Sequence, residues 1–272
     1  AKRLKGSGIK VFHYIPPQVW ASRKWRIKGI KKYVDEVLCI FPFEIEMYQK
    51  EGINVHYCGH PLIKQLPEKA DREQFFAKHG LDTTRPLVSI FPGSRTIELR
   101  FLANTFIKSA KQLQKKHPEI QFCISHAPNL SDDIFDKYIN GTDFKVIKGE
   151  NQALLSISDS LILASGTVAL EAALYQIPMI IGYKGPWILY LAYLMVRCIK
   201  KVSLPNIITG EDIVPELIQA KFNTENICYE TEKNLYNKEY RIGFISALGK
   251  VKEKLSDKYS AEEAANEIIK TL

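Results

Sequence analysis

The segment FPGSR, residues 91–95, joins an apolar run to a long amphipathic stretch, so it lies where a strand passes to a helix. Main-chain N–H groups at a helix start favour an anion, and an arginine can donate two hydrogen bonds to phosphate oxygens. Gly93 allows the backbone to approach such a ligand closely. Ser94 and Arg95 are therefore candidate phosphate-binding residues. The alternative is a plain Pro-Gly turn followed by a helix cap.

A second segment, ASGTVALEAAL at residues 164–174, places Ser165, Gly166 and Thr167 between an apolar run and a helical stretch. The hydroxyl and N–H groups of these small residues again suit a diphosphate. Glu171 follows four residues after Thr167 and therefore lies on the same helix face. A carboxylate repels phosphate, but it accepts hydrogen bonds from sugar hydroxyls. The alternative is a solvated helix residue.

A third candidate is Asn206, which follows a proline in VSLPNI, residues 202–207, and which we predict to lie in an apolar loop. Its amide can donate to and accept from a nucleotide or a sugar, although an ordinary turn residue is the alternative. The six histidines and five cysteines show no metal-ligand spacing, so the sequence predicts no metal site. The cysteines are odd in number and far apart, which indicates reduced, buried thiols in a cytosolic protein.

Apolar runs alternate with amphipathic stretches along most of the chain, which predicts βαβ units and a parallel sheet covered on both faces. The apolar runs are continuous, as in strands that are buried on both sides. The predicted strands are residues 8–15, 36–41, 53–59, 86–91, 120–125, 144–149, 160–165 and 178–183, and the predicted helices are residues 25–34, 42–52, 71–80, 97–117, 131–139, 151–158 and 167–176.

These elements divide the chain into three parts. Residues 66–250 hold enough strands and helices for a complete Rossmann-like domain. Residues 1–65 hold only about three strands, too few for a doubly wound sheet, so we interpret them as the C-terminal part of a second, truncated domain. Segment 59–73, which contains two prolines, is the predicted linker. We predict that residues 251–272 form a C-terminal helix that crosses back to the first domain or to a partner chain.

Basic side chains are concentrated at the start of the chain. Residues 1–32 contain ten Lys and Arg residues and no Asp or Glu, in a protein with a formal charge of +8. Such an end suits an anionic lipid surface, a phosphorylated ligand or nucleic acid, or it is simply solvated. Its aromatic residues form no nucleic-acid recognition motif, so no nucleic-acid partner is expected. Residues 187–198 are largely apolar but shorter than the roughly 20 residues of a spanning helix, which predicts a buried or interfacial helix.

Seven motifs follow one another along the chain, and they are HYIPPQVWA (13–21), FPFE (41–44), GHPL (59–62), FPGSR with Glu98, ASGTVALEAAL, PMIIGY (178–183) and VSLPNII (202–208). In this order they resemble lipid-A-disaccharide synthases over nearly the whole chain. The resemblance implies an α/β fold with two Rossmann-like domains of glycosyltransferase-B type, the N-terminal one truncated. It also implies a glycosyltransferase of lipid A (lipopolysaccharide) biosynthesis, which condenses UDP-2,3-diacylglucosamine with 2,3-diacylglucosamine 1-phosphate (lipid X) and releases UDP.

The resemblance further implies roles for single residues: Arg95 contacts the UDP diphosphate, Glu171 holds the ribose or the sugar, and Trp187 stacks near the base. No metal or other cofactor is expected. The expected location is cytoplasmic, peripheral on the cytoplasmic face of the inner membrane, and homodimer formation is left open. The implied UDP-sugar-binding set is Ser94, Arg95, Ser165, Gly166, Thr167, Glu171, Trp187 and Asn206, and the acceptor- or membrane-side set is His13, Tyr14, Trp20 and Arg23.

The chain departs from the family at its start, where it lacks a Gly-rich segment and the acidic residues that are candidates for the general base. We therefore name no catalytic base and expect it upstream of Ala1. Asp35 and Glu44 are expected to be structural, and we expect little transferase activity from this chain alone. Two alternatives stay open. One is another UDP-N-acetylglucosamine-using enzyme of the same fold, a cell-wall transferase or a 2-epimerase, and the other is a non-catalytic nucleotide-sugar-binding module.

Overall fold

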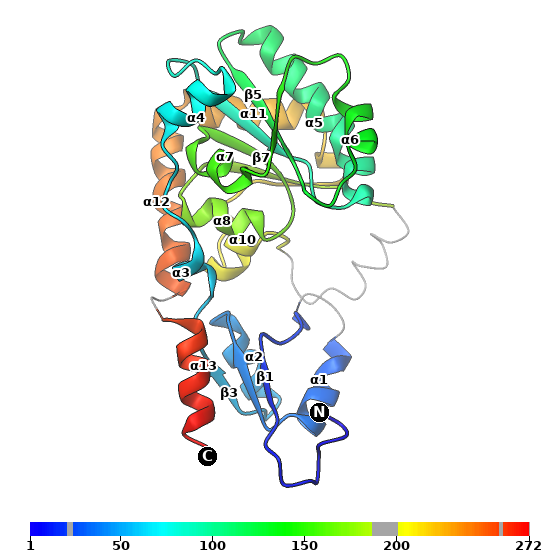
Figure 1. The fold of residues 1–272 in the computed structure, drawn as a ribbon, viewed down its shortest axis with the longest axis vertical. Coiled ribbons are helices and arrows are strands. Elements are labelled where there is room, and N and C mark those ends of the chain that lie inside the picture. Colours follow the sequence, from blue (N-terminus) through cyan, green and yellow to red (C-terminus); the bar gives the residue numbers. More distant parts are fainter. Residues whose placement is uncertain (21–23, 187–200, 256–257, 272) are drawn as a thin grey trace. The chain divides into compact units, whose positions relative to one another are not determined.

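The protein consists of two compact units, each built around its own parallel sheet (Figure 1). The first unit contains residues 1–66 and the chain from residue 252 onward, and the second contains residues 67–186 and 201–251. The computed structural model describes residues 1–20, 24–186, 201–255 and 258–271.

The second unit contains a six-stranded sheet in the order β6-β5-β4-β7-β8-β9, in which every neighbouring pair is parallel. Every side chain of β4, β5 and β7 is buried, as their continuous apolar sequences predicted. The five strands predicted between residues 86 and 183 are confirmed. The strands are β4 (Leu87–Phe91), β5 (Gln121–His126), β6 (Lys145–Lys148), β7 (Ser160–Ala164), β8 (Met179–Tyr183) and β9 (Glu216–Ile218).

Helices cover both faces of this sheet. Val88, Ile90 and Ile162 pack in one core with side chains of α5, α6 and α11. On the opposite face, Ser158 at the end of α7 donates a hydrogen bond to Ser89 over 2.7 Å between the two Oγ atoms. The helical elements are α4 (Arg72–His79), α5 (Thr96–Lys116), α6 (Asp132–Ile139), α7 (Asn151–Ile157), α8 (Val168–Leu174), α10 (Leu204–Thr209), η2 (Gln219–Lys221), α11 (Thr224–Tyr236) and α12 (Lys238–Leu255).

The strand order contains one reversal of direction. From β4 the chain winds outward through β5 to β6, and it then returns to the other side of β4 to form β7 and, beyond it, β8 and β9. In such a doubly wound sheet the loops that follow the two central strands diverge, and this leaves a crevice at their carboxyl ends. The carboxyl ends of β4 and β7 are therefore where a fold of this kind is expected to bind a ligand.

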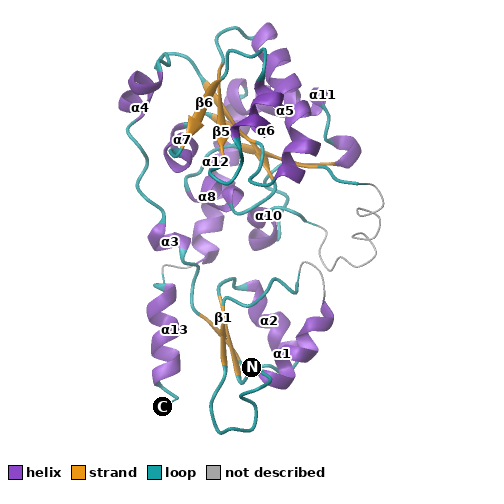
Figure 2. Ribbon diagram, turned by 45° about the vertical axis from the view of Figure 1, so that its right-hand side comes forward, coloured by secondary structure: helices purple, strands orange, loops and turns teal. Residues whose placement is uncertain are grey.

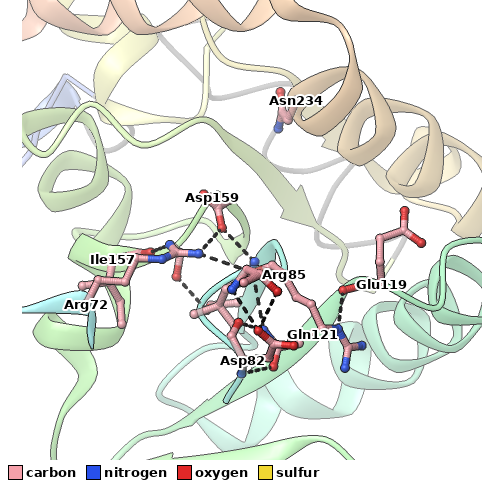
Figure 3. A network of polar contacts seen from close by, with 12 residues as sticks. Arg72, Asp82, Arg85, Glu119, Gln121, Ile157, Asp159 and Asn234 are labelled. Carbon is pink, nitrogen blue, oxygen red and sulfur yellow. Dashed lines mark hydrogen bonds and ion pairs between the residues drawn. The ribbon is translucent and has the colours of Figure 1, made fainter. Parts of the chain in front are cut away.

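A polar network holds the opposite, amino-terminal edge of the sheet together (Figure 3). Arg72 of α4 forms an ion pair with Asp159 over 2.8 Å between Nη2 and Oδ2, and the same oxygen accepts a hydrogen bond from the Leu87 N–H at 2.8 Å. Gln121 joins the start of β5 to Asp82, whose N–H donates to the amide oxygen at 2.7 Å. These contacts fix the starts of three strands, so their far ends are positioned for a site.

The first unit contains three parallel strands in the order β1-β2-β3. Val37 and Cys39 of β2 pack with α1 and α2, whereas Leu38 between them packs with Ala264 of α13. Figure 2 accordingly shows α1 and α2 on one side of the sheet and α13 on the other. The elements are β1 (Phe12–Tyr14), η1 (Lys24–Arg26), α1 (Ile27–Tyr33), β2 (Glu36–Cys39), α2 (Phe43–Lys50), β3 (Val55–Tyr57), α3 (Leu62–Gln65) and α13 (Ser260–Ile269).

Two predictions of local structure were wrong. The strand predicted at 8–15 is much shorter, because only β1 pairs with a neighbouring strand. The segment predicted as an apolar loop around Asn206 is the helix α10, whose Pro205 lies in the first turn, where a missing N–H costs no helical hydrogen bond. The apolar run 187–198 lies outside the described residues. Among those described, no helix is both long enough and apolar enough to cross a bilayer.

A buried carboxyl group lies in the first unit, immediately after β2. Glu44 is 1% exposed. Its Oε1 accepts a hydrogen bond from Trp20 Nε1 at 3.0 Å, and its Oε2 accepts one from the Phe41 N–H at 3.2 Å. Burial disfavours the charged form and raises the pKa of Glu44 to about 7, although both hydrogen bonds act in the opposite direction. Glu44 therefore ties α2 to Trp20 and changes charge near neutral pH.

We expect Glu44 to make the protein less stable as the pH rises. Folding raises the pKa of this carboxyl group from 4.5 to about 7. Its contribution to stability is complete below pH 4.5, and it is lost as the pH rises through about 7. Between these limits, wild type should lose about 3 kcal/mol of unfolding free energy relative to Glu44→Gln. Urea unfolding at pH 4.5 and pH 8 measures the difference.

The matched control for this experiment is Glu46→Gln, because Glu46 lies on the same helix but is exposed and pairs with Lys50 over 2.6 Å. This variant should keep the pH dependence of the wild type. Parallel stability curves for wild type and Glu44→Gln would contradict the prediction.

Candidate functional site

Two polar loops leave the six-stranded sheet from its two central strands. The ladder between β4 and β7 pairs Phe91 with Leu163, so both loops start at the same level of the sheet edge. One loop carries Ser94 and Arg95, and the other carries Ser165 to Thr167. The two segments that the sequence analysis chose for an anion thus meet at the carboxyl ends of β4 and β7.

Arg95 is the N-cap residue of α5, and its side chain is 74% exposed. Its guanidinium pairs with Glu98 of the same helix over 2.7 Å between Nη1 and Oε1. The other carboxylate oxygen of Glu98 accepts hydrogen bonds from the N–H groups of Ser94 at 2.8 Å and Arg95 at 3.3 Å. These N–H groups, which the sequence analysis expected to face a phosphate, are therefore already engaged by a carboxylate of the protein itself.

The loop after β7 is open. Gly166 and Thr167 are exposed, and among the described residues no atom beyond the chain neighbours of Gly166 lies within 4 Å of the position that a Cβ on it would occupy. Thr167 makes no side-chain hydrogen bond to cap α8. Ser165 donates a hydrogen bond to the carbonyl of Val202 at 3.4 Å. The hydroxyl of Thr167 and the backbone around Gly166 are therefore accessible from solvent.

Glu171 of α8 is half-buried, and burial raises the pKa of its carboxyl group, against a hydrogen bond from Gln152 that lowers it. Gln152 also lines an open pocket of about 510 Å³ at the carboxyl ends of β5 and β6. The sequence analysis did not predict this pocket, because its walls come from distant segments. The lining residues are Pro67, Glu68, Ala70, Pro128, Gly149, Glu150, Asn151, Gln152 and Ala153. The volume lies within the range of small-molecule sites.

Asn206 is 1% exposed, and its side chain is bound within the fold. Its Nδ2 donates to the carbonyl of Val214 and to Glu216, each at 2.9 Å, and its Oδ1 accepts from the Val214 N–H at 2.8 Å. Glu216 also accepts hydrogen bonds from Ser203 N–H at 2.8 Å and Ser203 Oγ at 2.7 Å. The described contacts thus join α10 to β9, and a role for Asn206 in donor binding stays a prediction.

The residues predicted for the acceptor or membrane side belong to the first unit. Trp20 is buried and packs edge-to-face on Phe43, with 5.1 Å between ring centroids. Tyr14 is partly exposed, and its hydroxyl lies 2.9 Å from Ser260 Oγ. His13 is partly buried, and burial lowers the pKa of its imidazole. Arg23, like Trp187 of the donor set, lies outside the described residues.

His60 is a residue that the sequence analysis missed. It follows β3, is buried, and lies with its ring centroid 5.0 Å from that of Phe41. Burial lowers the pKa of its imidazole to about 4, so the ring is neutral at physiological pH. His60 lies within the motif GHPL (59–62), but no role was predicted for its side chain. Among the described residues, no group of three or more His, Cys, Asp or Glu side chains is arranged to hold a metal ion.

The strand order and the two loops at the switch point define an α/β protein with the parallel sheets of glycosyltransferase-B enzymes. Two of the solved structures that are similar to this chain illustrate the fold. One is a UDP-GlcNAc 2-epimerase from Neisseria meningitidis bound to UDP-GlcNAc, with a TM-score of 0.65 and 14% identity over 98% of this chain and 71% of that chain. The other is WaaG, a glycosyltransferase involved in lipopolysaccharide biosynthesis. Its TM-score is 0.51, and it is 15% identical over 98% of this chain and 80% of that chain.

Sequence comparison identifies the family. The profile of the family described as LpxB, Lipid-A-disaccharide synthetase, matches residues 1–269. The chain is 36% identical to the lipid-A-disaccharide synthase of Coxiella burnetii (strain CbuG_Q212), over 98% of this chain and 71% of the relative. It is 35% identical to the lipid-A-disaccharide synthase of Geobacter sulfurreducens, over 100% of this chain and 71% of the relative. The chain belongs to the lipid-A-disaccharide synthetase family, which confirms the predicted fold class and glycosyltransferase activity.

Removal of Glu216 should destabilise the second unit. In Glu216→Ala the N–H and hydroxyl of Ser203 and one N–H of Asn206 lose their acceptor beneath α10. We expect a loss of about 3 kcal/mol in unfolding free energy, because each buried group left unpaired is costly. Chemical unfolding measures it. Glu225→Ala, at an exposed position in α11, is the control, and equal stabilities of the two variants would refute this role of Glu216.

Proposed function

We propose that the second unit binds the donor UDP-2,3-diacylglucosamine at the carboxyl ends of β4 and β7. The sugar is transferred to 2,3-diacylglucosamine 1-phosphate, and UDP is released. Family membership supports the two substrates. The location of the donor site is supported by one observation. The exposed guanidinium of Arg95 lies at the switch point, where the open loop of Ser165 to Thr167 also begins.

When the bond between the sugar and the β-phosphate oxygen breaks, that phosphate gains a negative charge, so fixed donors near it lower the barrier. Arg95 supplies a permanent positive charge and N–H groups arranged for bidentate contact. The N–H and hydroxyl groups of the open loop can add neutral donors on the other side of the switch point. Glu171, which is half-buried and lies one helical turn further along, is suited to accept hydrogen bonds from sugar or ribose hydroxyls.

The first unit carries features that suit an anionic lipid surface, where both lipid-linked substrates reside. Trp25 is 70% exposed, with the Arg26 guanidinium 5.9 Å from its ring centroid. In α1, Ile27 and Ile30 are buried, whereas Lys28, Lys31 and Lys32 are exposed. An exposed indole among cations gains from the headgroup layer and from anionic lipid together. We therefore propose that α1 contacts the membrane surface.

Arg95→Ala should weaken UDP binding by about 10- to 100-fold, because a charged hydrogen bond to the diphosphate is lost. Isothermal titration calorimetry with UDP measures the affinity. Arg100→Ala is the matched control, since Arg100 is another exposed arginine of α5. Equal UDP affinities of wild type and Arg95→Ala would refute the proposed location of the donor.

Replacement of Lys28, Lys31 and Lys32 by Gln should reduce binding to vesicles that contain phosphatidylglycerol by about 10-fold or more, at roughly 1 kcal/mol for each cation near the surface. Vesicle sedimentation measures the bound fraction. The matched control replaces Lys108, Lys111 and Lys115 on α5, which are also exposed. The same loss in both triple variants, or equal binding to neutral phosphatidylcholine vesicles, would argue against a membrane role for α1.

A further inference from the structure

Glu98 of α5 lies at the centre of the loop that carries Arg95. One carboxylate oxygen accepts hydrogen bonds from the N–H groups of Ser94 at 2.8 Å and Arg95 at 3.3 Å. The other oxygen pairs with the Arg95 guanidinium at 2.7 Å. A single side chain thus satisfies two main-chain donors and holds the arginine side chain that belongs to the same loop.

The backbone is shaped around this carboxylate. Gly93 has a φ of +110°, which favours glycine, and a Cβ at this position would lie 2.3 Å from Glu98 Oε2 and 2.6 Å from Glu98 Cβ. Asn129, from the loop after β5, donates a hydrogen bond to the carbonyl of Ser94 from another side. The side chain of Glu98 is therefore a fixed part of the loop, and only glycine at position 93 leaves room for it.

This arrangement changes which groups are available to a diphosphate. The Ser94 and Arg95 N–H groups are occupied, but the guanidinium uses only Nη1 in its pair with Glu98 and has further N–H groups. An exposed arginine normally loses much rotamer freedom when it binds a ligand. An arginine that is already held in one orientation loses less, and it binds more tightly for that reason.

We propose that Glu98 is a positioning residue for donor binding, which holds the Arg95 guanidinium in the orientation that receives the diphosphate. The proposal rests on the proposed binding of UDP at Arg95. A contribution to stability alone does not account for the pair, because an ion pair with a partner that is 74% exposed stabilises a protein little. The effect of the ion pair is to orient the side chain of Arg95.

The experiment must distinguish this role from simple repulsion between the Glu98 carboxylate and the diphosphate. With repulsion alone, Glu98 would compete with the ligand for Arg95, and its neutralisation would strengthen UDP binding. The sign of the change in affinity separates the two roles. Glu98→Gln is the informative variant, because its amide oxygen can still accept from the Ser94 N–H, while its NH₂ group faces the guanidinium and cannot pair with it.

The experiment is a double-mutant cycle, with UDP affinity measured by calorimetry on wild type, Glu98→Gln, Arg95→Ala and the double variant. We expect Glu98→Gln to weaken UDP binding about 5- to 10-fold. We expect the double variant to bind as Arg95→Ala does, because a residue that acts through Arg95 has no further effect without it. Glu98→Asp, which keeps the charge but is one methylene shorter, should also bind UDP more weakly than wild type.

Glu225→Gln is the matched control, because Glu225 also lies in the first turn of a helix of the same unit, and its UDP affinity should equal that of wild type. Unchanged or tighter UDP binding by Glu98→Gln, together with weaker binding by Arg95→Ala, would overturn this inference and leave the proposed function intact. Weakening by Glu98→Gln that persists in the Arg95→Ala background would show a capping role instead, and would overturn it too. No effect of Arg95→Ala would refute the proposed function itself.

Discussion

The structure of the second unit depends on one topological constraint, the reversal of winding between β4 and β7. The carboxyl ends of parallel strands all lie at one edge of the sheet. The connections that follow β4 and β7 turn away from each other, and this leaves a gap between these two strands. The loop with Arg95 and the loop with Ser165 to Thr167 are about 70 residues apart in sequence, yet they start at paired positions of one ladder. The location of the proposed site follows from strand order before any side chain is considered.

At the amino-terminal edge of the same sheet, polar side chains pair with groups of the protein itself. There Arg72 forms an ion pair with Asp159, and the amide of Gln121 forms hydrogen bonds with the main chain of Asp82 (Figure 3). At the carboxyl edge, by contrast, the side chain of Arg95 is largely exposed, and the side chain of Thr167 forms no capping hydrogen bond to α8. These side chains are therefore accessible from solvent, as the proposed donor site requires.

Much of the fold was predictable from sequence, because short continuous apolar runs such as 86–91 and 160–165, which alternate with amphipathic stretches, are typical of strands buried on both faces. The approach of the two loops to each other also follows from the βαβ pattern. The helix α10 was missed because Pro205 suggested a loop, although proline is accepted in a first turn. The contacts of Glu98 and Glu216 were not predictable, since each depends on main-chain N–H directions that only the folded chain fixes.

Three glutamates perform the same local chemistry with different consequences. Glu44, Glu98 and Glu216 each accept a hydrogen bond from a main-chain N–H near a helix start. Glu44 is buried, so the loss of solvent makes its ionisation costly despite its hydrogen bonds and ties stability to pH. Glu216 joins α10 to β9 and serves the fold. Glu98 alone pairs with an exposed cation at the switch point, and for that reason its carboxylate can influence a ligand that it does not touch.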